Sequence, residues 1–474
     1  MTHYDLVIIG TGSGNSIPGP DFDDWNIAIV ENGIFGGTCL NVGCIPTKMF
    51  VYPAEIAEGI VEGPPLGIHA TLDRVDWKSM RDRIFGRIDP IAAGGKAYRE
   101  GDECPNITVY TGTGTFTGTK TLHIDLADGT TEDITADQFV IAAGSRADVP
   151  DIPGLDTVRY HTSDTVMRIE DVPRRVVIVG SGYIAAEFGH VFASFGSEVT
   201  QIARGPLLLR HHDEDISRAF TEAASARYDV RLNTQVTSAA PGPTGGDGVV
   251  LQLDGPDGVA TLEADLLLVA TGRIPNGDRL NVAATGVQLD DEGRVVVDEY
   301  QRTAVTGIWA LGDVSTEHQL KHVANHETRV VAHNLAHPDS LITSDHRFVP
   351  GAVFSHPQIA SVGLTEQQAR DRGVEYVTAR RDYGGVAAGW AREDTTGFCK
   401  VIADPVTGQL LGVHIIGPEA ATVIQPAITA MHFSIPAHDL ARGQYWIHPA
   451  LPEVLENALL ALPEPTGEGS PDSR

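Results

Sequence analysis

Short apolar runs that end in glycine-rich turns are the dominant pattern of the first half of this chain. The run "YDLVII" leads directly into Gly10, Gly12 and Gly14, and a second run, "NIAIVE", ends at Glu31. A buried strand, a glycine turn and an acidic residue about 20 positions later are typical of a dinucleotide-binding unit, in which the acid binds ribose hydroxyls. The pattern therefore predicts a nucleotide site near the N-terminus.

The segment after this first turn departs from the usual pattern. Asn15 stands where a third glycine or alanine is common, and Pro18, Gly19 and Pro20 follow. Proline inside a helix removes a backbone hydrogen bond and clashes with the preceding turn. We therefore expect one turn of helix here, followed by a loop.

A second unit of the same kind lies further along the chain. A strand over 175–179 leads into Gly180, Gly182 and Ala185, an amphipathic helix follows, and a third strand begins at Glu198. This match is cleaner than the first. Two such units predict two dinucleotides held by different domains.

The second unit also indicates which nucleotide it binds. An NAD site would place an acidic residue at the end of the strand "VTQIA", but Ala203 stands there, followed by Arg204 and then Arg210. Two guanidinium groups can bind a 2′-phosphate through charge-assisted hydrogen bonds. The pair favours NADPH, the alternative being two ordinary exposed arginines.

Further along, the pattern continues and then changes. The segments "DQFVIAAGSR" and "ADLLLVATGRIPN" are strands with glycine turns at Gly144 and Gly272, where we expect the chain to cross between nucleotide domains. The strand at 307–314 brings Asp313 to its carboxyl end, where ligands bind in such sheets. From about residue 348 alternating strands precede helices without a glycine fingerprint, which predicts a third domain.

Composition and charge narrow the class of protein. The chain has 474 residues, 42 % of them hydrophobic, and a net charge of −29, with lysine at only six positions. Such an acidic surface repels nucleic acids and anionic membranes. No apolar stretch is as long as a membrane span, and the start "MTHYDLVIIG" lacks the features of a secretory signal. We therefore expect a globular protein of the cytoplasm, without nucleic-acid or membrane partners.

Cys39 and Cys44 stand close together in "GGTCLNVGCIPTKMF" although the chain has only four cysteines. They can be metal ligands, a structural disulfide, packing residues or a redox pair. A zinc site would need further ligands, usually a second cysteine pair, so no metal is expected. The segment from Cys44 onward reads as a helix, and a thiol at a helix N-terminus has a lowered pKa. Cys104 and Cys399 have no such setting.

Taken together, the two glycine units, the cysteine pair and the C-terminal "HPALPE" resemble the pyridine nucleotide–disulfide oxidoreductases, a family of flavoenzymes. The resemblance implies an α/β fold with two Rossmann-like domains, for FAD and NADPH, and a C-terminal α+β dimerisation domain. We expect the following division: 1–150, first part of the FAD-binding domain; 151–275, NADPH-binding domain; 276–345, second, central part of the FAD-binding domain; 346–465, dimerisation domain; 466–474, disordered tail.

The resemblance also assigns roles around the cysteine pair. Cys39 and Cys44 would form the redox disulfide, with Cys44 as the thiolate against the flavin and Cys39 as the thiol that attacks the substrate. Lys48 would touch the flavin and pair with Glu187, and Tyr183 would cover the flavin until nicotinamide arrives. An aromatic residue packed at a helix start is the alternative for Tyr183.

Other cofactor contacts follow from the same resemblance. Glu31 would bind the adenosine ribose of FAD, and Asp313 the ribityl hydroxyls. The helix expected over 320–335 would direct its N-terminus at the flavin, and its residues His322 and His326 are either structural or substrate-lining. The remaining contacts with FAD and NADPH would come from the glycine turns and their neighbours: Gly10, Gly12, Gly14, Thr38, Gly144, Gly180, Gly182, Ala185, Gly272, Arg204 and Arg210.

His448 and Glu453, within "HPALPE", match the acid–base pair of the family. In the family this histidine reaches the active site of the other subunit, so a homodimer with a shared site is implied. The reaction would be NADPH-driven reduction of a small-molecule disulfide. Reduction of glutathione disulfide and oxidation of dihydrolipoamide are rivals in the same class, and a non-catalytic redox sensor is a rival of another class.

The segment between the first glycine turn and the second strand bears on the substrate. Residues 11–30 contain no lysine or arginine but carry Asp21, Asp23 and Asp24. Such a rim would repel a substrate with several carboxylates. It favours a disulfide that presents hydroxyl groups, unless the loop points into solvent and touches no substrate.

Overall fold

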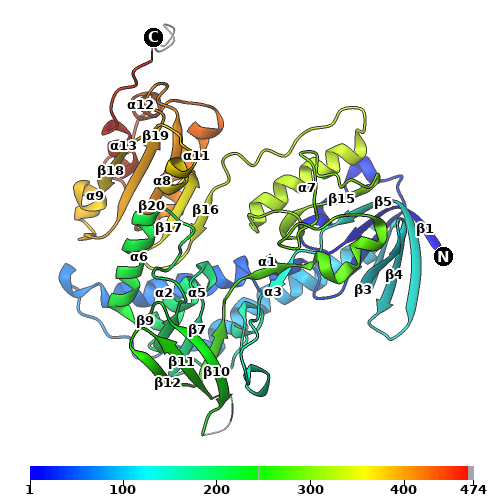
Figure 1. The fold of residues 1–474 in the computed structure, drawn as a ribbon, viewed down its shortest axis with the longest axis horizontal. Coiled ribbons are helices and arrows are strands. Elements are labelled where there is room, and N and C mark those ends of the chain that lie inside the picture. The colour runs from blue at the N-terminus through cyan, green and yellow to red at the C-terminus, as the bar shows by residue number, and fades with distance from the viewer. Residues whose placement is uncertain (244–245, 247, 468–474) are drawn as a thin grey trace.

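Three main sheets, each with its own helices, make up the described chain, which is residues 1–243, 246 and 248–467 of a computed structural model (Figure 1). The first is built from the N-terminal segment and from a later segment that returns to it. Its strands are β1 (Thr2–Ile9), β2 (Ile27–Glu31), β3 (Ile107–Gly118), β4 (Thr121–Leu126), β5 (Thr131–Ile141) and β15 (Ile308–Ala310). Its helices are α1 (Gly37–Asn41), α2 (Cys44–Val61), α3 (Trp77–Glu100) and α7 (Lys321–Ala336).

Strand β1 lies at the centre of the first sheet, with β2 and β5 parallel to it on either side. Its side chains alternate between two cores: Tyr4, Val7 and Ile9 face the β3–β4–β5 meander, whereas Leu6 and Ile8 face α7. Strands covered on both faces are continuously apolar, as β2 is. β15 pairs with β5 in parallel, so the segment around Asp313 joins the sheet formed by the N-terminal residues.

The second sheet has the order β13-β7-β8-β9 and is parallel throughout. Its strands are β7 (Arg175–Val179), β8 (Glu198–Ile202), β9 (Asp229–Arg231) and β13 (Leu266–Val269), with helices α4 (Ser163–Val166), α5 (Tyr183–Ser194) and α6 (Glu214–Arg227). β10 (Gln235–Pro241), β11 (Val249–Gly255) and β12 (Gly258–Ala264) form an antiparallel sheet beside it. β6 (Ser145–Ala147) pairs with β14 (Arg273–Pro275) where the chain crosses between the first two regions.

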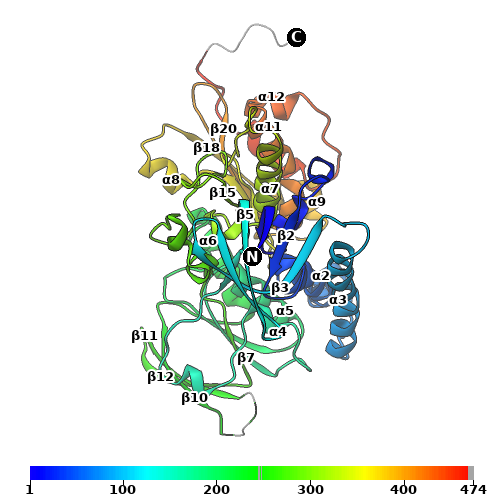
Figure 2. The same ribbon diagram turned by 90° about the vertical axis from the view of Figure 1, so that its right-hand side faces the viewer.

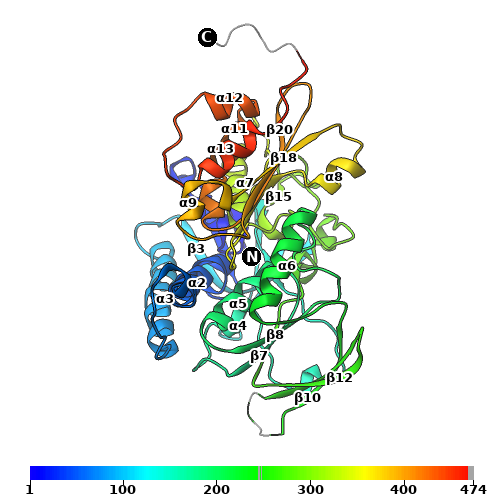
Figure 3. The same cartoon turned by 90° about the vertical axis from the view of Figure 1, so that its left-hand side faces the viewer.

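The third sheet is antiparallel and has the order β16-β17-β20-β19-β18. Its strands are β16 (Gly351–Val353), β17 (Ile359–Gly363), β18 (Val377–Asp382), β19 (Phe398–Ala403) and β20 (Leu410–Ile416). The helices of this region are α8 (Glu366–Asp371), α9 (Ala387–Trp390), α10 (Ala420–Val423), α11 (Gln425–His432), α12 (Ala437–Arg442) and α13 (Glu453–Leu460). Figures 2 and 3 show this region at the end of the molecule opposite to β10–β12.

Helix α2 connects the first region to the second. Its residue Phe50 stacks on Trp77 of α3, and Trp77 stacks in turn on Phe192 of α5. These rings belong to one buried apolar cluster that extends to β7 and β13. The segment that begins with Cys44 is therefore held firmly against the second region.

Several elements confirm the local predictions. The first glycine turn continues into one 3₁₀ turn, Ser13–Ser16, and then into a loop. β7 spans 175–179, β8 begins at Glu198 and α2 begins at Cys44, as predicted. α7 begins one residue after the predicted start.

Only the first two residues of the tail predicted to be disordered, 466–474, lie within the described residues. The backbone N–H groups of Thr466 and Gly467 donate to the carbonyls of Pro405 and Val406. Residues 468–474 lie outside the described residues, so the prediction of disorder there is untested. No helix within the described ranges combines the length and apolar character that a membrane crossing requires.

Candidate active site

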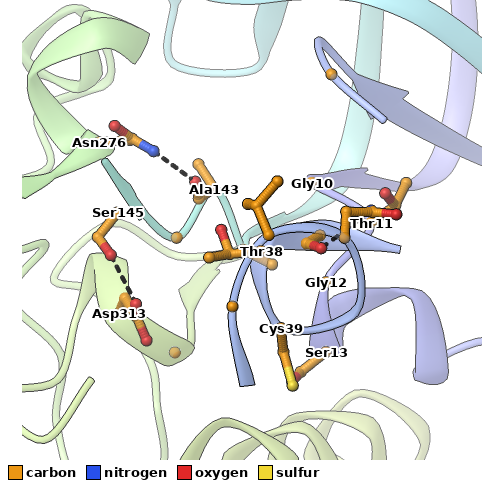
Figure 4. Close-up of a pocket in the computed structure, with 18 of the residues that line it drawn as sticks. Gly10, Thr11, Gly12, Ser13, Thr38, Cys39, Ala143, Ser145, Asn276 and Asp313 are labelled. Carbon is orange, nitrogen blue, oxygen red and sulfur yellow. Dashed lines mark hydrogen bonds between the residues drawn. The ribbon is translucent and has the colours of Figure 1, made fainter. Parts of the chain in front are cut away.

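A cavity of about 780 Å³ lies beside the carboxyl ends of the first sheet's parallel strands (Figure 4). It is lined by the first glycine turn, the segment 36–48, the start of α5 and the start of α7. Eleven of the predicted site residues line it: Gly10, Gly12, Glu31, Thr38, Cys39, Cys44, Lys48, Gly144, Tyr183, Glu187 and Asp313. Tertiary structure therefore gathers residues from four distant stretches of sequence around one space.

The glycines of the first turn serve different purposes. Gly10 has φ +104°, and a Cβ there would lie 2.4 Å from the carbonyl oxygen of Ala142. A Cβ on Gly14 would lie 2.7 Å from the Ala142 Cβ. Gly12 faces open space and lines the cavity, so a bound group can approach its backbone closely.

Asn15, which departs from the glycine pattern, has a structural role. Its side-chain oxygen accepts from Arg99 Nε at 3.0 Å, and its backbone carbonyl accepts from Arg99 Nη2 at 2.7 Å. The residue does not line the cavity. The asparagine therefore fastens the loop to α3 without obstructing the nucleotide site.

Glu31 is held in place at the end of β2. One carboxylate oxygen accepts from the backbone N–H of Thr11 at 2.8 Å, and the other from the N–H of Gly33 at 2.7 Å. These bonds orient the carboxylate at the rim of the cavity, where an acceptor for ribose hydroxyls is expected.

The cysteine pair lies on two consecutive helices. Cys39 is in the short helix α1, and Cys44 is the first residue of α2. Both are free thiols in this structure. Cys104 and Cys399 are buried elsewhere, and burial raises the pKa of Cys399.

The two thiols have opposite acidities. A hydrogen bond from Cys39 lowers the pKa of Cys44 to about 6, against the raising effect of burial, and the charge of Lys48 lowers it further. The same hydrogen bond, together with burial, raises the pKa of Cys39. Cys44 is therefore the more acidic thiol of the pair, chiefly because of the hydrogen bond from Cys39.

Lys48 and Glu187 form an ion pair at the floor of the cavity. The Lys48 Nζ atom lies 2.7 Å from both carboxylate oxygens of Glu187, whose side chain is only 4 % exposed. Glu187 Oε1 also accepts from the backbone N–H of Phe354, and the Lys48 ammonium lies 4.8 Å from the Phe354 ring centroid. A carboxylate this buried would be costly without its cation.

Asp313 belongs to a cluster opposite the thiols. Its Oδ2 atom accepts from Ser145 Oγ at 2.6 Å, and Arg273 Nε donates to the same serine oxygen at 2.8 Å (Figure 4). Asp313 is thus oriented by residues that directly follow Gly144 and Gly272. The carboxylate remains at the cavity surface as an acceptor.

The second glycine turn repeats the geometry of the first outside this cavity. Gly180 has φ +149°, and a Cβ there would lie 2.1 Å from the carbonyl oxygen of Ala270. Gly182 faces open space, and Ala185 is fully buried in α5. The equivalence of the two turns is a property of the backbone as well as of the sequence.

Arg204 and Arg210 are both exposed in the loop between β8 and α6. A Cβ on Gly205 would lie 2.8 Å from the Arg210 side chain, so Arg210 folds back over the residue next to Arg204. The loop therefore presents two exposed guanidinium groups near the end of β8.

Tyr183 links the two nucleotide turns. It is the first residue of α5, its side chain lines the cavity and it is 41 % exposed. Burial of its hydroxyl raises the pKa of the phenol to about 12. The ring lies where it can separate the cavity from the second glycine turn.

His448 and Glu453 are paired but lie apart from the cavity. His448 Nδ1 lies 2.8 Å from Glu453 Oε1, and Glu453 Oε2 accepts from the backbone N–H of Ala450. The His448 side chain is 72 % exposed, and neither residue lines the cavity of this chain. Glu453 therefore fixes the orientation of the imidazole at a place outside the cavity of the same chain.

Comparison with known proteins shows the family to which this chain belongs. The family model described as pyridine nucleotide-disulphide oxidoreductase matches residues 4–328, and its dimerisation domain matches residues 349–459. The chain belongs to the pyridine nucleotide–disulfide oxidoreductases. It is an FAD-dependent disulfide reductase that uses NADPH.

Members of this family among the relatives differ in their disulfide chemistry. The chain is 54 % identical to the mycothione reductase of Mycobacterium tuberculosis over 98 % of its own length and 100 % of that protein's. It is 34 % identical to the dihydrolipoyl dehydrogenase of Mycobacterium bovis, over 98 % of each chain. The solved structure of the HOCl-induced flavoprotein disulfide reductase RclA of Escherichia coli superposes with a TM-score of 0.83, at 27 % identity, and covers 97 % of this chain and 100 % of that one.

The residues present fit the FAD that this family binds. Gly12 leaves its backbone open at the cavity, Glu31 presents an oriented carboxylate at one end and Asp313 presents another beside Ser145. Among the described residues no cluster of ligating side chains suits a metal ion.

His322 and His326 have structural contacts. His322 Nε2 lies 2.8 Å from the carbonyl oxygen of Pro350, and His326 Nε2 accepts from the backbone N–H of Asp345 at 3.2 Å. Both fasten α7 to the segment that leads into the third region.

The acidic loop does not touch the cavity. Asp21, Asp23 and Asp24 are exposed, and none of them lines it. Within one chain the repulsion of a carboxylate-rich substrate has no structural support.

Some cavity residues were missed by sequence reasoning. Ser145 and Arg273 directly follow the predicted glycines Gly144 and Gly272, so their positions were a usable signal. Lys321 is the first residue of α7, and Ser13 lies between two predicted glycines. No local pattern distinguishes these two, since their proximity arises only in the folded chain.

Proposed function

We propose that this chain reduces mycothione to two molecules of mycothiol, with NADPH as reductant and a homodimer as the active form. The observation that carries the substrate is the 54 % identity to a mycothione reductase, which extends over nearly the whole of both chains. The segments "GTGSGNS", "VGCIPTKMFVYPAE", "LKHVANHE" and "RGQYWIHPALPEVLENALL" carry the same resemblance.

The reductive half of the proposed cycle ends at the cysteine pair. FAD, held by the first glycine turn, Glu31 and Asp313, would supply the chemistry that carries two electrons from NADPH to the Cys39–Cys44 disulfide. The pair opens to one thiolate and one thiol. The low pKa of Cys44 and the raised pKa of Cys39 support assigning the thiolate to Cys44, beside Lys48.

In the oxidative half, Cys39 transfers its proton to the imidazole of His448 from the other subunit. The Cys39 thiolate then attacks one sulfur of the substrate, the substrate S–S bond breaks, and the departing thiolate takes the proton from the imidazolium. Cys44 attacks the Cys39 sulfur, restores the disulfide and releases the second half of the substrate as a thiolate, which takes up one proton from solution. NADPH, one proton and one disulfide thus give NADP⁺ and two thiols.

The shared site is supported by the exposure of the acid–base pair. The 2.8 Å contact between Glu453 Oε1 and His448 Nδ1 orients the imidazole. Tyr445 and Ile447, which shortly precede His448 in the chain, expose large apolar side chains, as a subunit interface requires. A two-fold dimer would bring each His448 to the cavity of the other chain.

The remaining predicted roles belong to the same proposal. Glu31 and Asp313 bind the adenosine ribose and the ribityl chain of FAD, Lys48 and Glu187 form the ion pair at the flavin, and Tyr183 covers it. The glycine turns and Thr38 hold the pyrophosphates and neighbouring groups, and Arg204 and Arg210 bind the 2′-phosphate of NADPH. We also propose the division into 1–150, 151–275, 276–345 and 346–465 for the functional domains.

Turnover with matched disulfides tests the substrate. The purified yellow holoenzyme is assayed for kcat/KM with mycothione, glutathione disulfide and, in reverse with NAD⁺, dihydrolipoamide. We expect a preference for mycothione by several orders of magnitude, and the Cys39→Ser variant serves as the inactive control that retains FAD. Equal or better use of glutathione disulfide would refute the substrate assignment.

A further inference from the structure

Two of the six lysines of this chain line the cofactor cavity. Lys48 comes from α2 and Lys321 begins α7, so separate elements of the first region bring them together. Lysine is scarce in this acidic protein, and a cation in a cavity is costly to desolvate. The two positive charges therefore call for a functional explanation, and only Lys48 has one so far.

The two lysines are paired differently. Lys48 is neutralised by both carboxylate oxygens of Glu187. Lys321 Nζ instead donates to the neutral hydroxyl of Ser13 at 2.8 Å, and Ser13 Oγ donates to Asn325 Oδ1 at 3.1 Å. Within the described part of the chain no carboxylate forms an ion pair with Lys321. Its charge thus remains available to a group that becomes negative in the cavity.

Cys39 is the cavity residue that would become negative in the proposed reaction. In Figure 4 the Cys39 sulfur and the Ser13 side chain point into the same part of the cavity. The titratable groups that act on Cys39 are Cys44 and Lys321, and those that act on Cys44 are Cys39, Lys48 and Glu187. The hydrogen bond with Cys44 and burial raise the pKa of Cys39, while the charge of Lys321 lowers it. Each sulfur therefore has its own lysine.

We propose that Lys321, held by Ser13, is the electrostatic partner that stabilises the Cys39 thiolate when this sulfur attacks the substrate disulfide. The inference rests on the proposed roles of the two cysteines. Cys39 loses its proton to His448 of the other subunit, and Lys321 stays protonated throughout. The ammonium balances the negative charge while the new S–S bond forms and the substrate S–S bond breaks.

A merely structural role is the competing explanation, because the Lys321–Ser13 bond also fastens α7 to the first glycine turn. The two explanations differ in whether they require a positive charge at position 321. Fastening requires a donor at position 321, whereas stabilising a thiolate requires a positive charge. A neutral residue there should therefore change the acidity of Cys39 even in a protein that folds and binds FAD normally.

The test is the pH dependence of Cys39 alkylation in the NADPH-reduced holoenzyme, with iodoacetamide as probe and fragment mass spectrometry to locate the label. Removing one opposite charge should move the alkylation midpoint of Lys321→Met upward by about one pH unit. Lys321→Arg should restore the wild-type midpoint. Lys78→Met, which removes an exposed cation of α3, is the matched control and should leave it unchanged.

An unchanged midpoint in Lys321→Met would overturn the proposal. If that variant does not retain FAD, Lys321→Gln is measured under the same criterion, because its amide keeps a donor for Ser13 without the charge. The measurement uses no mycothione. Failure of the substrate assignment and failure of this inference are therefore distinguishable.

Discussion

At the scale of single residues, Cys39 and Cys44 show how one hydrogen bond makes two identical side chains chemically unlike. The Cys39 S–H stabilises the Cys44 thiolate, and the same bond holds the proton on Cys39. Lys48 adds to the effect on Cys44 through its charge. The result is a pair in which the pKa of Cys44 is lowered and that of Cys39 is raised.

This difference predicts the spectra of two serine variants. Cys39→Ser should show a long-wavelength charge-transfer band between the Cys44 thiolate and oxidised FAD, and Cys44→Ser should lack it. Because a thiolate exists above its pKa, the band should fade as the pH falls through the pKa of Cys44 in that variant, which loses the Cys39 S–H that lowers this pKa in the intact pair. The measurement is an absorbance titration of the oxidised proteins. A band in Cys44→Ser alone would reverse the roles of the two sulfurs.

At the scale of elements, the loop between β8 and α6 carries both predicted phosphate ligands and is anchored from the third region. Asp213 in this loop accepts from Lys400 Nζ at 2.9 Å, and Lys400 also bonds to Asp215 and Glu366. Burial opposes the charge of Lys400, but its hydrogen bonds to these carboxylates outweigh burial and raise its pKa. The Lys400 ammonium thus ties this loop, which includes Arg210, to the third sheet.

The two arginines of this loop predict that the enzyme prefers NADPH to NADH. Each charge-assisted contact with a phosphate is worth about 1.5–3 kcal/mol, so Arg204→Ala/Arg210→Ala should lose at least about 100-fold of its preference for NADPH over NADH. The quantity to measure is the ratio of kcat/KM for the two nucleotides. Arg218→Ala, an exposed arginine of α6 that pairs with Glu214, is the control. An unchanged ratio in the double variant would place the phosphate elsewhere.

At the scale of the whole molecule, the residues of the proposed active site lie in two places. The cavity with the cysteine pair lies beside the first sheet, while His448 and Glu453 lie in the third region with an exposed imidazole. Tyr445 and Ile447, which shortly precede His448 in the chain, expose large apolar side chains. We therefore propose that a complete site forms only between two chains.

A subunit-mixing experiment tests whether the cysteine pair and His448 of one site come from different chains. Cys39→Ser and His448→Ala homodimers should each be nearly inactive. A mixed dimer has one complete site, so random exchange of equal amounts should restore about a quarter of the wild-type activity. The measurement is NADPH oxidation with mycothione after dissociation and reassociation. Mixtures without recovery, alongside a wild-type control that survives the same treatment, would show that the site is not shared.

The sequence alone determined what depends on short-range order. The bounds of β7, the start of α2 at Cys44 and the single turn after Gly14 follow from apolar runs, glycine conformations and proline chemistry within a few residues. The family, its cofactors and its reaction followed from motifs of the same kind, because glycine turns and a spaced cysteine pair are local requirements of the chemistry. The site residues assigned by resemblance remain predictions.

Only the tertiary structure decided which groups act on one another across long separations in the chain. The bonds from Arg99 to Asn15 and from Lys321 to Ser13 join segments whose proximity no local pattern encodes. The backbone hydrogen bonds from Thr466 and Gly467 to the loop at 405–406 are likewise not encoded in the composition of the tail. Electrostatic and hydrogen-bonding effects depend on distance in space, and packing of the sheets and helices sets that distance.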